Sequence, residues 1–177
     1  MSSSNLSTDH HSHSPIVFWC WALIILFIFS VFRLPGLGVP LASDELAMMS
    51  LWAQMPYLKI FSNYQYPNNH IFLSLVLSFL LKTFGLKEWL LRMPLLVCGI
   101  ISICQAYCLG RRLSSNSTVG LFTAVLMTIC EKHIFYSTNA RGYLVIMVLA
   151  LLVVTCLLNR LEGHSFKAKK LSNRISG

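Results

Sequence analysis

The sequence predicts an all-α membrane protein with four transmembrane helices and two interfacial helices in a long first extracytoplasmic loop. Composition gives the first reason: 55% of the 177 residues are hydrophobic and 11% are charged, against about 25% in a typical soluble domain. The distribution of charge gives the second. The formal net charge of +8 comes from basic residues clustered between apolar runs, a pattern that marks membrane topology. We therefore expect no nucleic-acid partner.

The amino-terminal part is predicted to contain a tail, one span and a long loop. Residues 1–15 are polar and rich in Ser and His, which is typical of a disordered tail, here on the cytoplasmic side. The apolar run 16–32 has neither a basic segment before it nor a small-residue cleavage site after it, so we expect an uncleaved first span. Residues 33–88 are less hydrophobic and contain several prolines and glycines, which predicts an ordered extracytoplasmic loop.

One apolar run inside this loop is too short to cross a bilayer. The run 71–81 has 11 residues and would rise about 16 Å as a helix, against a hydrocarbon core of roughly 30 Å. We interpret it as an interfacial helix. The longer runs that follow predict three more spans, at 89–109, 119–136 and 143–158.

The basic residues favour four spans over five. The membrane domain, 16–160, is followed by a basic tail, 161–177. With four spans, this tail and the Arg111-Arg112 turn share the cytoplasmic side with the amino terminus, as the positive-inside rule prefers. A fifth span at 71–81 would move both basic groups outside.

Two adjacent carboxylates, Asp44 and Glu45, follow the first span and open a predicted amphipathic helix. Ser43 is placed to cap this helix, and Leu46, Met49 and Ala53 are expected to share one face. Acids in a first turn are favoured by the helix dipole alone, so the pair by itself does not indicate catalysis.

Five motifs in order resemble the amino-terminal module of the polyprenyl-phosphate-dependent GT-C membrane glycosyltransferases, in the branch of the protein O-mannosyltransferases and the lipid A aminoarabinose transferases. The motifs are Asp44-Glu45, Tyr66-Pro67-Asn68-Asn69-His70, Leu91-Arg92-Met93-Pro94, Leu109-Gly110-Arg111-Arg112-Leu113, and the stretch from His133 through Tyr136-Ser137 and Ala140-Arg141 to Tyr143. Members of this family are usually much longer. We therefore expect this chain to be a truncated module, incomplete as an enzyme.

The resemblance implies a site at the extracytoplasmic face. Asp44 would be the general base that takes the acceptor's proton, with Glu45 as a secondary acid. Arg141 would bind the donor phosphate with Lys132 assisting, because a guanidinium can hold two phosphate oxygens at once. The substrate-orienting residues would be His70, His133 and Tyr143.

Ordinary interfacial roles remain open for several of these residues. Without the resemblance, Arg141 and Lys132 could be interfacial anchors, and His70 and His133 could be satisfied polar groups.

The expected donor is a polyprenyl-phosphate sugar, and we expect no cofactor and no metal, since cationic side chains can hold the leaving phosphate. The expected partners are membrane lipid, the lipid-linked sugar, and either a carboxy-terminal part or another membrane subunit. The expected location is a bacterial inner membrane, with the active face outward. The sequence leaves an alternative open: a small non-catalytic membrane protein that binds a lipid-linked sugar or acts as an assembly or transport accessory.

Overall fold

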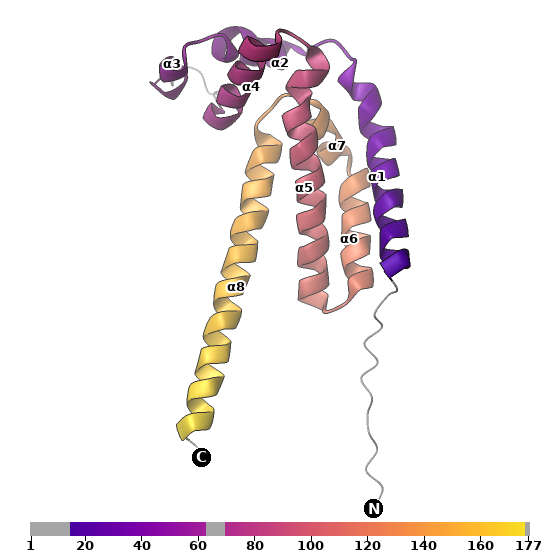
Figure 1. Ribbon diagram of the computed structural model, residues 1–177, viewed down its shortest axis with the longest axis vertical. Helices are drawn as coiled ribbons and strands as arrows, with labels where there is room; N and C mark the ends of the chain where they lie inside the picture. The colour runs from indigo at the N-terminus through magenta and orange to yellow at the C-terminus, as the bar shows by residue number, and fades with distance from the viewer. Residues whose placement is uncertain (1–14, 63–69, 176–177) are drawn as a thin grey trace, which may run out of the picture.

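The computed structural model describes residues 15–62 and 70–175, and within these ranges all regular elements are helical (Figure 1). The expectation of an all-α protein is confirmed for this part of the chain. In chain order the elements are α1 (Pro15–Leu37), α2 (Ser43–Ala47), the π-helix η1 (Met48–Ala53), α3 (Tyr57–Ser62), α4 (Ile71–Phe84), α5 (Glu88–Ser114), α6 (Ser117–Ile129), α7 (Glu131–Thr138) and α8 (Tyr143–Ile175).

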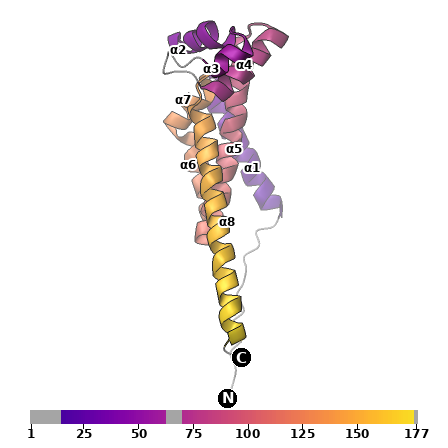
Figure 2. The ribbon, with the colours of Figure 1, turned by 90° about the vertical axis from the view of Figure 1, so that its left-hand side faces the viewer.

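The helices form a bundle with a layer across one end. The long helices α1, α5, α6 and α8 run along the molecule, and α5 packs against both α6 and α8 (Figure 1). The short helices α2, α3 and α4 gather at one end, as Figures 1 and 2 both show. The helix α7 continues from α6 toward this end layer, and the turn at 139–142 then leads into α8.

Three helices of the described chain are long and apolar enough to cross a membrane: Trp19–Leu37, Glu88–Ser114 and Tyr143–Gly163. The predicted span 119–136 is instead a pair of helices, α6 and α7, bent by 60° at Cys130. The number of spans is four if this bent pair counts as one. The chain therefore has the helices of a membrane protein, while the four-span count stays a prediction.

The short helix α4 extends three residues beyond the predicted run 71–81. Its 14 residues rise about 21 Å, still less than the roughly 30 Å of a hydrocarbon core. Its location at the membrane interface remains a prediction.

Two helices extend further than the sequence suggested. The first, α1, continues to Leu37, so Arg33 and Pro35 lie inside the helix and not in the loop expected from residue 33. The last, α8, continues through most of the basic segment predicted as a separate tail. The predicted amino-terminal tail lies outside the described residues, except for Pro15.

The helix that carries the acidic pair begins and winds differently from the prediction. Ala42, not Ser43, is the N-cap of α2, and Ser43 is its first helical residue. Met49 and Ala53 are buried, but Leu46 is 52% exposed. The buried face is formed by Glu45, Met48, Met49, Trp52 and Ala53, and Leu46 lies outside it.

The buried side of η1 anchors the end layer to the long helices. Met48, Met49, Trp52 and Ala53 form one core cluster with α4, the start of α5 and the start of α8. A second cluster joins α1, α5 and α6 through Phe29, Leu96, Ile103 and Ala124.

Glycines allow α5 and α6 to approach closely near their connecting turn. A Cβ atom at Gly120 would lie 2.8 Å from the carbonyl oxygen of Tyr107, and one at Gly110 would lie 2.6 Å from Oγ1 of Thr123. Small residues permit such close helix contacts in membrane bundles. Gly110, in the motif before Arg111-Arg112, therefore has a packing role.

Candidate functional site

The candidate site centres on an ion pair between Asp44 and Arg141. Asp44 lies in the first turn of α2, and Arg141 lies in the turn between α7 and α8. The guanidinium Nη2 of Arg141 contacts Oδ2 of Asp44. The side chain of Arg141 is 26% exposed and that of Asp44 is 52% exposed. The structure thus brings the predicted base and the predicted phosphate ligand into contact with each other.

Glu45, beside Asp44, is buried and fully engaged with protein groups. Its Oε1 accepts hydrogen bonds from Nε of Arg92 at 3.0 Å and from the amide of Ala140 at 2.7 Å. Its Oε2 accepts from Nη2 of Arg92 at 2.6 Å and from the amide of Ala42 at 2.9 Å. Glu45 is 1% exposed, so these four bonds take the place of water.

The electrostatics of Glu45 favour its ionised form. Burial by itself would raise the pKa of this carboxyl group, but the hydrogen bonds from Arg92, Ala140 and Ala42 together outweigh burial and lower the pKa below its usual 4.5. The carboxylate is therefore held charged and in place. This environment suits a positioning residue better than a secondary catalytic acid.

Arg92 joins this carboxylate to the end of α1. Its Nη1 donates to the carbonyl oxygens of Gly36 and Val39, both at 2.7 Å. A helix leaves its last carbonyl groups without helical partners, and a cation near that end also interacts favourably with the helix dipole. Arg92 is 2% exposed, so it caps α1 from inside the protein and aligns the loop that leads to α2.

His70 and Tyr143 lie beside the ion pair, as the start of α4 and the start of α8 meet. Their rings contact edge to face with centroids 5.4 Å apart, and the Tyr136 ring lies 4.9 Å from that of Tyr143. Burial lowers the pKa of His70 below its usual value, which favours the neutral imidazole. His70 also packs against Gly142, where a Cβ atom would lie 2.7 Å from Nδ1. This group therefore forms one side of the site next to Arg141.

His133 does not reach this site, because it is buried in the bundle. Nη2 of Arg33 lies 2.7 Å from Nδ1 of His133, and Oγ of Ser102 lies 2.8 Å from Nε2. Arg33 has only donors, so Nδ1 accepts; the Ser102 hydroxyl donates to the carbonyl of Gly99 at 2.8 Å, so Nε2 carries the proton. Both ring nitrogens are occupied. His133 thus differs from the expected substrate-orienting residue, and we assign it a structural role.

Arg33 organises the break between α6 and α7. It is fully buried, donates to Oγ of Ser137 at 2.8 Å and to the carbonyl of Thr128 at 3.1 Å, and lies over the Phe29 ring. Because α6 ends at Ile129, the Thr128 carbonyl has no helical partner of its own. Arg33 therefore satisfies the end of α6 much as Arg92 satisfies the end of α1.

Lys132, the second predicted phosphate ligand, lies away from Arg141. It is exposed in the first turn of α7, whereas Arg141 follows the last turn of that helix. Thr138 lies six positions after Lys132 in this helix, a rise of about 9 Å. The structure brings together Asp44, Arg141, His70 and Tyr143, and it separates Lys132 and His133 from them.

Arg33 and Arg92 were not predicted as site residues. Ionisable side chains within apolar helices are rare and usually have specific partners, so the placement of both arginines was a usable signal. The sequence did not indicate which groups these arginines would bind, because the main partners lie far from them in the chain.

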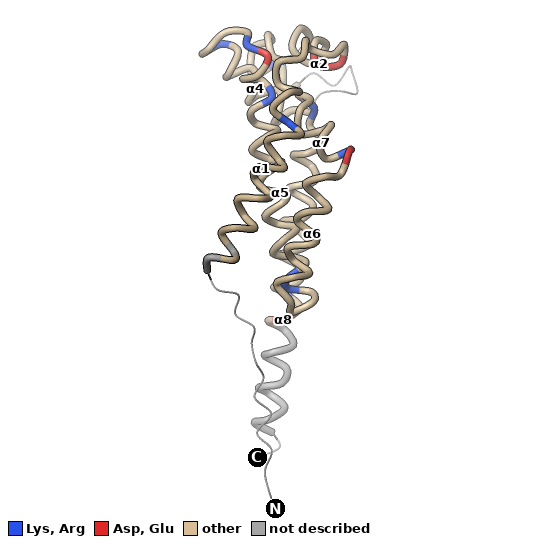
Figure 3. The backbone as a smooth tube through the Cα atoms, turned by 90° about the vertical axis from the view of Figure 1, so that its right-hand side faces the viewer, with Lys and Arg blue, Asp and Glu red and all other residues tan. Residues whose placement is uncertain are grey.

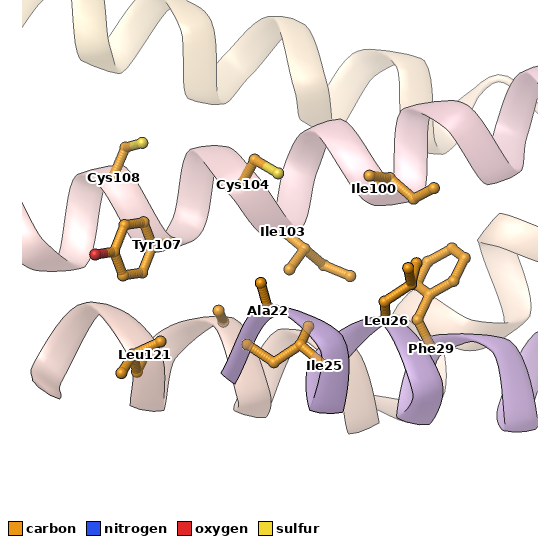
Figure 4. Close-up of a pocket in the computed structure, with 11 residues that line it drawn as sticks. Ala22, Ile25, Leu26, Phe29, Ile100, Ile103, Cys104, Tyr107, Cys108 and Leu121 are labelled. Atoms are coloured by element: carbon orange, nitrogen blue, oxygen red, sulfur yellow. The ribbon is translucent and has the colours of Figure 1, made fainter. Parts of the chain in front are cut away.

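A separate apolar pocket of about 450 Å³ lies between α1, α5 and α6 (Figure 4). It is lined by Ala22, Ile25, Leu26, Phe29, Ile100, Ile103, Cys104, Tyr107, Cys108, Leu121 and Ala124. None of the predicted site residues lines it, and its wall carries no charged side chain. Among the residues that the structure describes, no group of three or more His, Cys, Asp or Glu side chains is arranged to hold a metal ion.

Comparison of the chain with protein-family models, with curated proteins and with solved structures finds no match. The glycosyltransferase resemblance therefore depends on the five sequence motifs.

Proposed function

We propose that this protein is a membrane glycosyltransferase module that transfers a sugar from a polyprenyl-phosphate donor to an acceptor. The contact between Asp44 and Arg141 carries the proposal. It places a carboxylate and a guanidinium at one accessible position, and sugar transfer from a phosphate donor needs a proton acceptor and a phosphate ligand close together.

In this proposal the partly exposed pair Asp44 and Arg141 does the chemistry, and the buried charges hold the pair in place. Asp44 removes the proton of the acceptor hydroxyl, and Arg141 binds the phosphate that leaves the sugar. Glu45 and Arg92 fix the backbone on both sides of the site. The neutral His70 packs against Gly142, the residue after Arg141, and contacts the ring of the partly exposed Tyr143. An accessible ion pair held in place by buried charges favours a catalytic role for Asp44 and Arg141 over a purely structural one.

We further propose that the site faces outward from a bacterial inner membrane, with four spans. An ion pair between Arg112 and Glu162, 2.6 Å between Nη2 and Oε2, joins the end of α5 to the second half of α8. The last turn of α5, with Arg111 and Arg112, thus lies beside α8 at one end of the bundle, and the layer with α2 lies at the other end (Figures 1 and 3). The positive-inside rule would then place the basic end in the cytoplasm.

Activity of the purified chain tests the proposal. The full chain in lipid nanodiscs would be supplied with a set of polyprenyl-phosphate sugars, and release of polyprenyl phosphate would be measured with and without acceptors. Asp44→Asn should lower turnover by about 10²- to 10⁴-fold, the range typical of a general base. Glu131→Gln, which removes an exposed acid at the start of α7, is the control and should keep full turnover.

Binding measurements test the donor site at Arg141. Arg141→Ala should weaken donor binding by about 1.5–3 kcal/mol, and Arg141→Lys should recover part of that, because a point charge cannot make a two-pronged contact. Donor binding without turnover by the wild-type chain is expected both of an incomplete module and of the non-catalytic accessory, so the Arg141 variants, and not turnover, test the site. Donor binding that is unchanged in Arg141→Ala would overturn the site.

A further inference from the structure

We propose that Asp44 is a built-in occupant of the anion site at Arg141, and that the phosphate of the donor must displace it before Asp44 can act as a base. This inference rests on the proposed function and adds an order of events to it. The donor binds first, and its own charge releases the catalytic carboxylate.

The charges around Arg141 support a single, replaceable partner. In the part of the chain that the structure describes, Asp44 is the one acid in contact with Arg141. Glu45 is committed to Arg92, and Glu162 is committed to Arg112 at the other end of the bundle. A phosphate that approaches Arg141 therefore competes with Asp44 for the same guanidinium.

The exposure of the pair makes this competition easy for a phosphate to win. The two side chains keep 26% and 52% of their surface exposed, and exposed ion pairs contribute only about 0.2–1 kcal/mol. The phosphodiester of the donor carries one negative charge, as the Asp44 carboxylate does, and can accept two hydrogen bonds from the guanidinium fork, so it can take the place of Asp44 on Arg141.

The buried contacts allow the side chains to separate while the site stays assembled. Oε1 of Glu45 holds the amide of Ala140, the residue before Arg141, and Glu45 is itself the residue after Asp44. The backbone on both sides of the pair is therefore fixed independently of the ion pair. When a phosphate takes Arg141, Asp44 has only to rotate its side chain to face the sugar.

The transfer step forms one bond at the anomeric carbon of the sugar and breaks another. The acceptor oxygen forms a bond to the anomeric carbon while the bond from that carbon to the phosphate oxygen breaks. The bonding electrons leave with the phosphate oxygen, which Arg141 holds, and the acceptor proton moves to Asp44. The products are the glycosylated acceptor and polyprenyl phosphate. After the lipid phosphate departs and Asp44 loses its proton, the ion pair forms again.

Affinity for a short polyprenyl phosphate, measured on the full chain in uncharged lipid nanodiscs, tests the proposal. Asp44→Asn and Asp44→Ala should bind about 1.5- to 5-fold more tightly than wild type, because the competing carboxylate is gone. Glu131→Gln removes the same charge from a residue that does not contact Arg141 and should leave the affinity unchanged. The corresponding polyprenyl alcohol, which lacks the phosphate, should bind all these variants alike.

The double variant Asp44→Asn/Arg141→Ala makes the test decisive. The gain in affinity should disappear in the Arg141→Ala background, because Asp44 then has no guanidinium to occupy. A gain that persists there, a gain for the alcohol, or no gain in either Asp44 variant would overturn the competition. If Arg141→Ala still weakens phosphate binding in that last case, the proposed donor site survives and only the displacement fails. If Arg141→Ala binds polyprenyl phosphate like wild type, the donor site itself is wrong.

Discussion

Glu45 accepts a hydrogen bond of 2.7 Å from the backbone amide of Ala140, although 95 positions separate the two residues. The bond joins the residue after Asp44 to the residue before Arg141. Arg92 completes the connection, since it contacts both oxygens of Glu45 and the end of α1. The geometry of Asp44 and Arg141 is therefore set by a buried acid that takes no part in their ion pair.

Loss of the buried Glu45–Arg92 pair should destabilise the protein strongly. Glu45→Gln keeps the shape of the side chain but leaves the buried Arg92 without its counter-charge, and breaking such a pair typically costs about 3–5 kcal/mol. Denaturant titration of the protein in detergent micelles measures the change. The control is Arg112→Gln, which breaks a partly exposed pair at the surface and should cost much less. Equal losses in the two variants would contradict a structural role for the buried pair.

Acid should weaken the fold through Glu45. Its pKa is lowered in the folded state, so below pH 4.5 the unfolded chain takes up a proton before the folded protein does. The free energy of unfolding contributed by Glu45 is fully present above pH 4.5 and is lost as the pH falls through the lowered folded value. Unfolding measured from pH 7 downward should show this loss in wild type and a shallower acid slope in Glu45→Gln. Identical slopes would show that Glu45 does not contribute.

His133 should matter for stability and not for donor binding. Ser102→Ala removes the acceptor for the Nε2 proton of His133 in a buried place, which should cost about 1–3 kcal/mol of unfolding free energy. Affinity for polyprenyl phosphate should remain that of wild type. Ser30→Ala is a matched control, because that exposed hydroxyl bonds only a carbonyl of its own helix. A Ser102→Ala protein with normal stability but weaker donor binding would return His133 to a substrate-orienting role.

The contact between His70 and Gly142 should tolerate no added methyl group. In Gly142→Ala the new Cβ would overlap the His70 ring, and such overpacking costs about 1–3 kcal/mol. His70→Ala should relieve the clash, so the double variant should lose less than the sum of the two single variants. Gly38→Ala is the control, because no atom lies within 4 Å of the position its Cβ would take. Additive losses would mean that the two residues do not touch.

The helix α4 should lie at the surface of the bilayer and not cross it. A cysteine at Lys87, introduced into a chain without its native cysteines, should react with an impermeant reagent added to intact cells. A cysteine at Arg111 should react only after the membrane is permeabilised, because 21 residues of predicted span, 89–109, separate the two positions. If the cysteine at Lys87 reacts only after permeabilisation while the one at Arg111 reacts in intact cells, α4 crosses the membrane and the proposed outward site is wrong.

The sequence determined the elements that depend on local pattern. Apolar runs predicted α1, α5 and α8, and a short run predicted α4, because the length and hydropathy of a helix are local properties. The break between α6 and α7 was not visible, since the apolar run continues up to Cys130. The π-helix was also missed, because no residue type marks it.

The tertiary structure alone decided which charged and polar residues share a site. Asp44 and Arg141 were predicted to converge from motifs, and the fold brings them into contact; Glu45, His133 and Lys132 were grouped with them but take other positions. The buried roles of Arg33 and Arg92 arise because helix ends leave carbonyl groups that a low-dielectric interior requires to be satisfied. Which arginine binds which helix end depends on how the helices pack. Packing between segments that are distant in sequence cannot be predicted from a local pattern of residues.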